Sequence, residues 1–271
     1  MDSSAIARQL GDPRELLVGL DFDGVLSPIV ADPQSARIHP LGPDLLVRLA
    51  QAVRRVAIIT GRPAAQAVGL GDLDRVADLV GAAGSLVVLG QYGAERWSAT
   101  DRQVTGPPPP ESLAAFGRDL TDLLHAESAA DAWVEEKGLA LAVHTRRMAD
   151  PAAAYALLEG PVRALALRHG LHLEPGRMVL EVRAPGADKG LALADQLEQT
   201  GARGLLLIGD DLGDVPGFVE AERRRAAGLR ALLVCSGSDE QDRLRSMADM
   251  VVDGPDGVMA LLSDLLDHLS T

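Results

Sequence analysis

The chain has 271 residues, of which 47% are hydrophobic and 24% are charged, and its formal net charge at pH 7 is −13. This length and apolar content allow a full-sized core in one large domain or two modest ones, and they exclude a largely disordered chain. The acidic balance argues against broad nucleic-acid binding, because contact with the phosphate backbone needs a basic surface.

Short apolar runs and a single cysteine bear on where the protein works. The longest apolar runs, residues 205–208 and 231–234 among them, are far too short to span a bilayer. The start of the chain has neither a basic segment nor a long apolar stretch. Cys235 has no second cysteine with which to form an internal disulfide, which fits a reducing compartment. We therefore expect a soluble, cytoplasmic protein with neither a membrane nor a nucleic acid as partner.

Four short apolar runs share one layout along the chain. They are residues 16–20, 56–59, 205–208 and 231–234. Each is typical of a strand buried on both faces, and helical stretches around 44–53 and 219–227 separate them in pairs, as in a parallel α/β sheet. Ligands of such sheets bind beyond the carboxyl ends of the strands. We therefore expect one rim to carry Asp21, Thr60, Asp210 and Ser236.

The middle of the chain has a different order of predicted helices and strands, which begins after the proline run 107–110. A helix over 111–126 precedes strands over 132–136 and 139–144, and Lys137-Gly138 forms the turn between them. The same order recurs with a helix over 151–169, strands over 171–174 and 178–182, and a turn at Pro175-Gly176. The predicted fold is α/β, a Rossmann-like doubly wound parallel sheet with an inserted α+β cap of αββαββ order. The catalytic core covers residues 1–108 and 186–271, and the substrate-specificity cap covers residues 109–185.

The segment Asp21-Phe22-Asp23-Gly24 places two carboxylates two residues apart, directly after a predicted buried strand. One carboxylate can act as a nucleophile and form an aspartyl phosphate, which divides a difficult displacement into two easier ones. The other can protonate the leaving alcohol and then deprotonate water. Asp21 and Asp23 are the candidates for these two roles. The alternative is an ordinary turn, since Asp and Gly are common after strands.

A second acidic motif follows the strand over 205–208, and its sequence is Gly209-Asp210-Asp211-Leu212-Gly213-Asp214. Three carboxylates in five positions repel one another unless a cation neutralises them, and hard oxygen ligands on a tight loop suit Mg²⁺. The alternative for this motif alone is a solvated acidic loop. Two acidic motifs after two strands of one sheet favour the metal, so we expect Mg²⁺ at Asp21, Asp23, Asp210, Asp211 and Asp214.

Two weaker signals complete the predicted catalytic site. Thr60 opens the turn Thr60-Gly61-Arg62 after the second strand, and Lys189 precedes a helix in Asp188-Lys189-Gly190. A hydroxyl and an ammonium directed at phosphoryl oxygens would stabilise the charge of the transition state. Helix capping by Thr60 and a solvated Lys189 are the alternatives.

Four motifs in this order give the chain a specific resemblance. DFDGVL, IITGR, DKG and GDDLGD resemble the four-motif signature of the haloacid dehalogenase superfamily of phosphatases. The resemblance implies that Asp21 is the nucleophile, Asp23 the acid/base and Asp210 a magnesium ligand. It also implies that Thr60 and Lys189 bind phosphate, that Asp211 and Asp214 support the metal, and that a cap is inserted between the second and third motifs.

Within that superfamily the chain is most similar to the trehalose-6-phosphate phosphatase family, nearly from end to end. The stretches that carry this similarity include GQYGAE at 90–95, EEKG at 135–138, HTR at 144–146 and EVR at 181–183. The implied reaction is hydrolysis of trehalose 6-phosphate to trehalose and phosphate, the last step of trehalose biosynthesis. A disaccharide offers many hydroxyls, so its site needs acceptors and donors in fixed places. The expected substrate-binding residues are Arg62, Glu135, Lys137, His144, Glu181 and Arg183.

The chain also departs from the pattern of that family. Val25 replaces a common Thr, Tyr92 stands where many relatives have His, and Val215-Pro216 leaves one acidic residue fewer near the metal. Three other readings stay open. They are a phosphatase for another sugar phosphate, such as a glycosyl-phosphoglycerate or sucrose phosphate, a sensor that binds a sugar phosphate without hydrolysing it, and an acidic scaffold protein. The presence of both Asp21 and Asp23 counts against the sensor.

Overall fold

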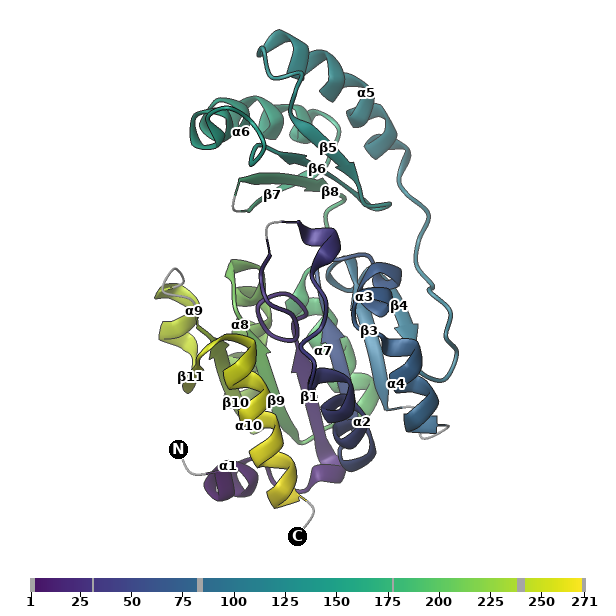
Figure 1. Cartoon of the computed structure of the whole chain (residues 1–271), viewed down its shortest axis with the longest axis vertical. Helices are drawn as coiled ribbons and strands as arrows, with labels where there is room; N and C mark the ends of the chain where they lie inside the picture. The colour runs from purple at the N-terminus through teal and green to yellow at the C-terminus, as the bar shows by residue number, and fades with distance from the viewer. Residues whose placement is uncertain (1–2, 31, 82–84, 177, 238–241, 270–271) are drawn as a thin grey trace. The chain divides into compact units, whose positions relative to one another are not determined.

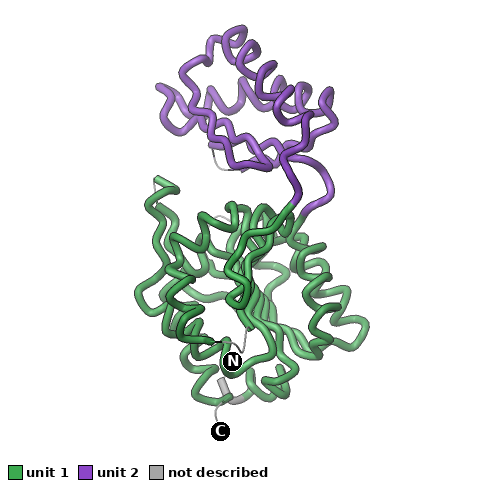
Figure 2. Tube along the Cα trace, turned by 90° about the vertical axis from the view of Figure 1, so that its right-hand side faces the viewer, with its two compact units in different colours: residues 1–106, 188–271 green, residues 107–187 purple. Residues whose placement is uncertain are grey.

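The computed structural model describes residues 3–30, 32–81, 85–176, 178–237 and 242–269. The chain divides into two compact units, shown in Figure 2. Unit 1 comprises residues 1–106 and 188–271, and unit 2 comprises residues 107–187. No helix of the described chain combines the length and the apolar character needed to cross a membrane. The assignment of a catalytic role to one unit and a specificity role to the other stays a prediction.

Unit 1 is built on a seven-stranded sheet of order β11-β10-β9-β1-β2-β3-β4 (Figure 1). Its strands are β1 Leu16–Leu20, β2 Arg55–Ile59, β3 Leu86–Gly90, β4 Glu95–Ser98, β9 Gly204–Gly209, β10 Arg230–Ser236 and β11 Met250–Val252. Every pairing is parallel except the antiparallel pair of β3 and β4. The sequence patterns identified β1, β2, β9 and β10 but not the other three strands of this sheet.

Helices cover both faces of this sheet. They are α1 Ser3–Leu10, α2 Gly42–Ala52, α3 Ala64–Leu70, α4 Leu73–Val80, α7 Lys189–Thr200, α8 Val215–Ala226, α9 Asp242–Met247 and α10 Gly254–Leu269. One core cluster joins Val18 and Leu20 to residues of α1, α2, α3, α4 and α10, and the other joins Leu17 to residues of α7, α8 and α9. Successive residues of β1 therefore enter opposite cores, which explains why its sequence is apolar throughout rather than alternating.

Unit 2 is an antiparallel sheet of order β5-β6-β8-β7 with two helices on one face. Its elements are α5 Glu111–Ala126, β5 Trp133–Glu136, β6 Ala140–His144, α6 Pro151–Arg168, β7 His172–Gly176 and β8 Val179–Arg183. Leu141, Val143, Leu180 and Val182 pack against the helices, and the residues between them in sequence face the other way. The predicted fold class is confirmed, with a mainly parallel central sheet and a separate α+β part of αββαββ order.

The predicted turn at Pro175-Gly176 is wrong. Both residues belong to β7, where Pro175 lies opposite Leu180 and Gly176 lies opposite Val179. β7 is an edge strand, so the missing N–H of a proline there removes no necessary hydrogen bond. The chain reverses after Gly176, and Met178 takes the left-handed conformation with φ of 57°.

Candidate active site

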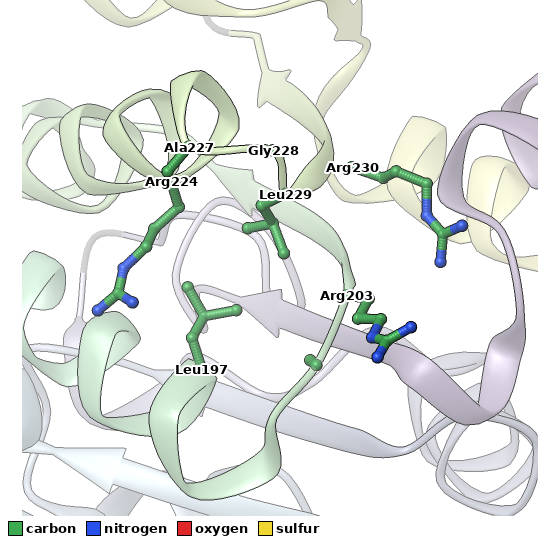
Figure 3. Close-up of a pocket in the computed structure, with 8 residues that line it drawn as sticks. Leu197, Arg203, Arg224, Ala227, Gly228, Leu229 and Arg230 are labelled. Carbon is green, nitrogen blue, oxygen red and sulfur yellow. The ribbon is translucent and has the colours of Figure 1, made fainter.

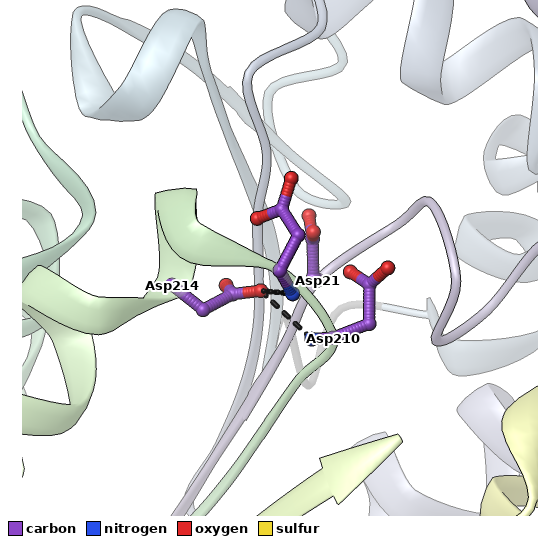
Figure 4. Close-up of side chains that lie close together, drawn as sticks. Asp21, Asp210 and Asp214 are labelled. Atoms are coloured by element: carbon purple, nitrogen blue, oxygen red, sulfur yellow. Dashed lines mark hydrogen bonds between the residues drawn. The ribbon is translucent and has the colours of Figure 1, made fainter. Parts of the chain in front are cut away.

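The carboxyl ends of β1 and β9 bring the two acidic motifs together. The strands are adjacent and parallel, with Leu20 opposite Ile208, and the backbone N–H of Asp21 donates to the Ile208 carbonyl at 3.0 Å. Asp21 and Asp210 are thus the first residues past two neighbouring strand ends. The acidic cluster consists of Asp21, Asp210, Asp211 and Asp214, and each offers a carboxylate oxygen within 4.8 Å of the others. Figure 4 labels Asp21, Asp210 and Asp214 of this cluster.

Lys189 is the cation of this cluster. Its Nζ lies 2.8 Å from Asp21 Oδ2 and 2.8 Å from Asp214 Oδ1, and the residue is 5% exposed. Lys189 is the first residue of α7, and the side chain of Asp188 caps that helix by accepting from the Leu191 N–H. Burial alone would lower the pKa of Lys189, but Asp21 and Asp214 outweigh it and raise this pKa well above its usual value. Lys189 is therefore a charged donor held between two carboxylates.

Four carboxylates against one ammonium leave the cluster short of positive charge. Burial raises the pKa of both Asp21 and Asp210 well above the usual value, Lys189 opposes this, and the neighbouring carboxylates add to it. Asp21, Asp210 and Asp214 are buried and Asp211 is exposed. Such a set of anionic oxygens fits a hard divalent cation, which would relieve the repulsion. Gly24 makes room for the cluster, because a Cβ there would fall 2.1 Å from Asp210 Oδ2.

Asp214 also supports the loop that carries Asp210. Its Oδ2 accepts from the backbone N–H groups of Asp210 at 2.9 Å and Asp211 at 3.3 Å. The side chain of Asp211 in turn accepts from the Gly213 N–H at 2.8 Å. The second acidic motif is therefore a tight capped turn, in which Asp214 holds both Lys189 and the backbone next to Asp210.

Arg62 forms a two-point ion pair with Asp23, the other carboxylate of the first acidic motif. Its Nε donates to Asp23 Oδ2 and its Nη2 to Asp23 Oδ1, each at 2.7 Å, and its Nη1 donates to the Pro33 carbonyl at 2.8 Å. The Arg62 side chain is 10% exposed, whereas that of Asp23 is 36% exposed. The guanidinium also lies over the ring of Phe22, 5.7 Å from its centroid. The residue predicted to bind substrate is thus paired with the residue predicted to move the proton.

The two remaining residues of the predicted rim lie at strand ends as expected. Thr60 is buried directly after β2, and its Oγ1 accepts from the Arg62 N–H at 3.1 Å. Ser236 ends β10, and its hydroxyl donates to the Gly24 carbonyl at 2.6 Å. Ser236 therefore fixes the turn after Asp23, while Thr60 fixes the turn that carries Arg62.

The predicted cap residues gather on one face of the unit 2 sheet. Glu135, Ala142, Glu181 and Glu174 lie opposite one another across the four strands. Ion pairs on this polar face include Lys137 to Glu181 at 2.6 Å, His144 to Glu135 at 2.9 Å, Arg183 to Glu174 at 3.1 Å and His172 to Glu174 at 3.5 Å. The polar face thus carries all five residues that the sequence analysis assigned to substrate within this unit.

Sequence reasoning missed three residues of this polar face, Trp133, Arg147 and Glu174. The Trp133 ring stacks on His144 with centroids 4.4 Å apart, and the Arg147 guanidinium lies 4.7 Å from the Trp133 centroid. The strand period would have found Trp133, because it lies two residues before Glu135 and so shares its face. The contact between Arg147 and Trp133 depends on the path of the loop after β6, which no sequence pattern indicates.

A cavity of about 510 Å³ lies at the opposite end of the unit 1 sheet (Figure 3). It is lined by Leu197, Ala202, Arg203, Arg224, Ala227, Gly228, Leu229 and Arg230. These residues stand where α7 and α8 end and where β9 and β10 begin. Arg224 pairs with Glu198 at 2.7 Å and Arg230 pairs with Glu15 at 3.2 Å. The cavity is therefore separate from the acidic cluster and does not add to the candidate active site.

The chain is similar in sequence to trehalose-phosphate phosphatases and to a longer mycobacterial protein. The family model described as trehalose-phosphatase matches residues 121–250. A Mycobacterium tuberculosis protein described as an uncharacterised glycosyl hydrolase is 34% identical over 260 residues, which are 93% of this chain and 18% of that protein. A probable trehalose-phosphate phosphatase of rice is 30% identical over 233 residues, which are 76% of this chain and 58% of that protein. The chain thus spans less than two thirds of both relatives.

The fold is shared with solved structures. The C-terminal domain of the Candida albicans trehalose-6-phosphate phosphatase superposes with a TM-score of 0.77 and 18% identity, over 98% of this chain and 97% of that one. A crystal structure described as a trehalose-6-phosphate phosphatase related protein has a TM-score of 0.68 and 22% identity, over 94% of this chain and all of that one. The chain is therefore similar to trehalose-phosphate phosphatases in sequence and shares the fold of these solved structures, in agreement with the resemblance indicated by its motifs.

Proposed function

We propose that this chain is a Mg²⁺-dependent phosphatase that hydrolyses trehalose 6-phosphate to trehalose and phosphate, as the last step of trehalose biosynthesis. The observation that carries the proposal is the buried pairing of Lys189 with Asp21 inside the acidic cluster. A nucleophilic carboxylate beside a phosphate-binding ammonium is the arrangement that phosphoryl transfer to an aspartate requires.

In the first step, a carboxylate oxygen of Asp21 attacks the phosphorus and the bond from phosphorus to the sugar oxygen breaks. Both oxygens of this carboxylate are oriented, since Oδ1 accepts from the Phe22 N–H at 2.7 Å and Oδ2 meets Lys189. Asp23 gives a proton to the departing sugar oxygen. In the second step, Asp23 takes a proton from water, the water oxygen bonds to phosphorus, and the Asp21 carboxylate is restored as phosphate leaves.

The residues that would hold Mg²⁺ are Asp21, Asp210 and the backbone carbonyl of Asp23, with Asp211 and Asp214 beside them. When bound, the ion would offset the negative charge of the carboxylates and of the phosphoryl oxygens. The raised pKa values of Asp21 and Asp210 support this proposal, because burial and then the neighbouring carboxylates disfavour their charged forms, which a bound cation would stabilise. Thr60 and Lys189 would donate to phosphoryl oxygens.

The polar face of unit 2 supplies the groups that a disaccharide needs. We assign contacts with sugar hydroxyls to Glu135, Lys137 and Glu181. Glu181 is 6% exposed, and its Oε1 has no hydrogen-bond partner among the described residues. A buried acceptor without a donor is unfavourable by about 1–3 kcal/mol, so a sugar hydroxyl there would be favoured. His144 and Arg183 hold neighbouring carboxylates of the same face, and they complete the predicted substrate residues of unit 2.

The proposal is tested by phosphate release from a panel of phosphorylated sugars with and without Mg²⁺. The panel contains trehalose 6-phosphate, sucrose phosphate, a glycosyl-phosphoglycerate and glucose 6-phosphate. We expect release that depends on Mg²⁺ and is fastest with trehalose 6-phosphate. Faster release from another sugar phosphate would keep the reaction and change the substrate. Binding of trehalose 6-phosphate without any phosphate release would favour the sensor instead.

Alanine variants separate substrate choice from catalysis. Glu135→Ala, Lys137→Ala and Glu181→Ala should each lower kcat/KM for trehalose 6-phosphate by about 10- to 1000-fold. They should affect para-nitrophenyl phosphate much less, because that substrate has no sugar hydroxyls. Glu136→Ala is the matched control, since Glu136 is an exposed neighbour on the other face of β5. Equal losses on both substrates would instead indicate a role in folding or in the chemical step.

A further inference from the structure

The two-point ion pair between Arg62 and Asp23 has no role in the proposed reaction as described so far. Two parallel N–H groups of Arg62 reach the two oxygens of one carboxylate at equal distances of 2.7 Å. This two-point geometry restrains both the position and the rotation of the carboxylate, which a single contact would leave free. Arg62 therefore controls where the oxygens of Asp23 point.

Arg62 also has contacts with residues other than Asp23. Its Nη1 donates to the Pro33 carbonyl at 2.8 Å, its flat face lies over Phe22, and its backbone N–H bonds the side chain of Thr60. The Arg62 side chain is 10% exposed and that of Asp23 is 36% exposed. The arginine is thus the buried member of the pair and the carboxylate is the member that can reach a ligand.

A phosphate-binding role would require N–H groups of Arg62 that reach the substrate. Two of its five N–H groups donate to Asp23 and one donates to the Pro33 carbonyl, and the side chain is only 10% exposed. We propose that Arg62 is a positioning residue, which acts on the reaction by aiming Asp23 at the leaving-group oxygen and does not itself bind the substrate. The inference rests on the proposed function and revises the substrate-binding assignment that the sequence suggested for Arg62.

The leaving group distinguishes the two roles. Expulsion of a sugar alkoxide needs a proton from Asp23, whereas para-nitrophenolate is stable enough to leave without one. Both substrates carry the same phosphoryl group. Loss of positioning should therefore slow the sugar phosphate selectively, whereas loss of a phosphate contact should slow both substrates alike.

The experiment is a double-mutant cycle with Arg62→Ala, Asp23→Asn and the variant that carries both, measured as kcat/KM on trehalose 6-phosphate and on para-nitrophenyl phosphate. We expect Arg62→Ala to lose about 10- to 100-fold on the sugar phosphate and less than about 3-fold on the artificial substrate. In the Asp23→Asn background, removal of Arg62 should add less than about 3-fold on either substrate, because its effect passes through Asp23.

Two features keep the result interpretable. The ratio of kcat/KM between two substrates on one sample does not depend on the fraction of protein that is folded. Should Arg62→Ala fail to fold, Arg62→Lys enters the same cycle, since it keeps the charge but cannot present two parallel N–H groups. Arg225→Ala is the matched control, because it removes a two-armed pair with Asp249 elsewhere in unit 1 and should leave the ratio unchanged.

The inference would be overturned by equal losses on both substrates, or by losses that multiply when Arg62→Ala and Asp23→Asn are combined. Either result would return Arg62 to substrate binding. The proposed function fails separately, on the wild-type protein. If trehalose 6-phosphate is not turned over, the best sugar phosphate of the panel takes its place in the cycle.

Discussion

Removing the charge of Lys189 should destabilise unit 1 strongly, whereas neutralising its partner Asp21 should not. Lys189→Met keeps most of the side-chain volume but deletes the ammonium that lies 2.8 Å from both Asp21 and Asp214. Breaking a buried ion pair from one side lowers the free energy of unfolding by about 3–5 kcal/mol, because it leaves buried charge uncompensated. In a unit of about 190 residues, a loss of about 1 kcal/mol in the free energy of unfolding lowers Tm by about 2–4 °C. Tm should therefore fall by about 6–20 °C.

Asp21→Asn is expected to behave in the opposite way. Burial raises the pKa of Asp21, so its ionised form is unfavourable in the folded protein when no metal is present. An amide of nearly the same shape removes that charge and the repulsion with Asp210 and Asp214. We expect a Tm equal to or a few degrees above that of the wild type, together with loss of activity.

Both variants are measured by thermal unfolding in the presence of a chelator. Lys137→Met is the matched control, since Lys137 is the other of the two lysines in the sequence and pairs with Glu181 in unit 2. Added Mg²⁺ should recover part of the loss in Lys189→Met. A wild-type Tm for Lys189→Met, or an equal drop for Asp21→Asn, would refute the electrostatic account of the cluster.

Three further predictions follow from the same cluster. Asp210→Asn should raise the Mg²⁺ concentration for half-maximal activity by at least about tenfold, and a shift below threefold in a metal titration would remove Asp210 from the ligand set. Gly24→Ala should lower kcat by about 100-fold, because the added Cβ would clash with Asp210 Oδ2. Gly81→Ala is the control for backbone strain alone, because Gly81 has a φ of +68° and no described residue apart from its chain neighbours comes within 4 Å of an added Cβ. In chelator, Tm should fall as the pH rises above the ordinary carboxyl range, because carboxyls with a raised pKa bind more protons there in the folded than in the unfolded state. The gain in Tm from Mg²⁺ should then be larger at higher pH, and a gain that does not change with pH would contradict the link between these carboxylates and the metal.

Burial leaves a strong sequence pattern that made part of the fold predictable, although β3, which is also buried inside the sheet, was missed. β1, β2, β9 and β10 lie inside the sheet, so both of their faces are apolar and they stand out as continuous runs. α5 was expected over 111–126, which are its bounds. β4 is short, with the sequence Glu95–Ser98, and β7 contains a Pro-Gly pair that is usually a turn signal. Edge strands such as these carry little pattern, because only part of each is buried.

The candidate site was predictable to the level of residue types and not of contacts. The position of Asp21 and Asp210 follows from two parallel neighbouring strands, which the sequence pattern indicates. The pairing of Arg62 with Asp23 joins residues 39 positions apart through two turns, and no periodicity reports it. Likewise, the pairing of Lys137 with Glu181 depends on the order of β5, β6 and β8, which a list of strands does not contain.

The central prediction is that the reaction proceeds through an acyl phosphate formed on the Asp21 carboxyl group. The most direct measurement is acid quench of the enzyme during turnover of trehalose 6-phosphate with Mg²⁺, followed by borohydride reduction and mass spectrometry of the peptide around residue 21. Reduction converts an acyl phosphate to an alcohol, so homoserine should appear at this position, and it should be absent from the unreacted enzyme and from Asp21→Asn. Unmodified aspartate at residue 21 during full turnover, or phosphate release by Asp21→Asn at the wild-type rate, would contradict the account.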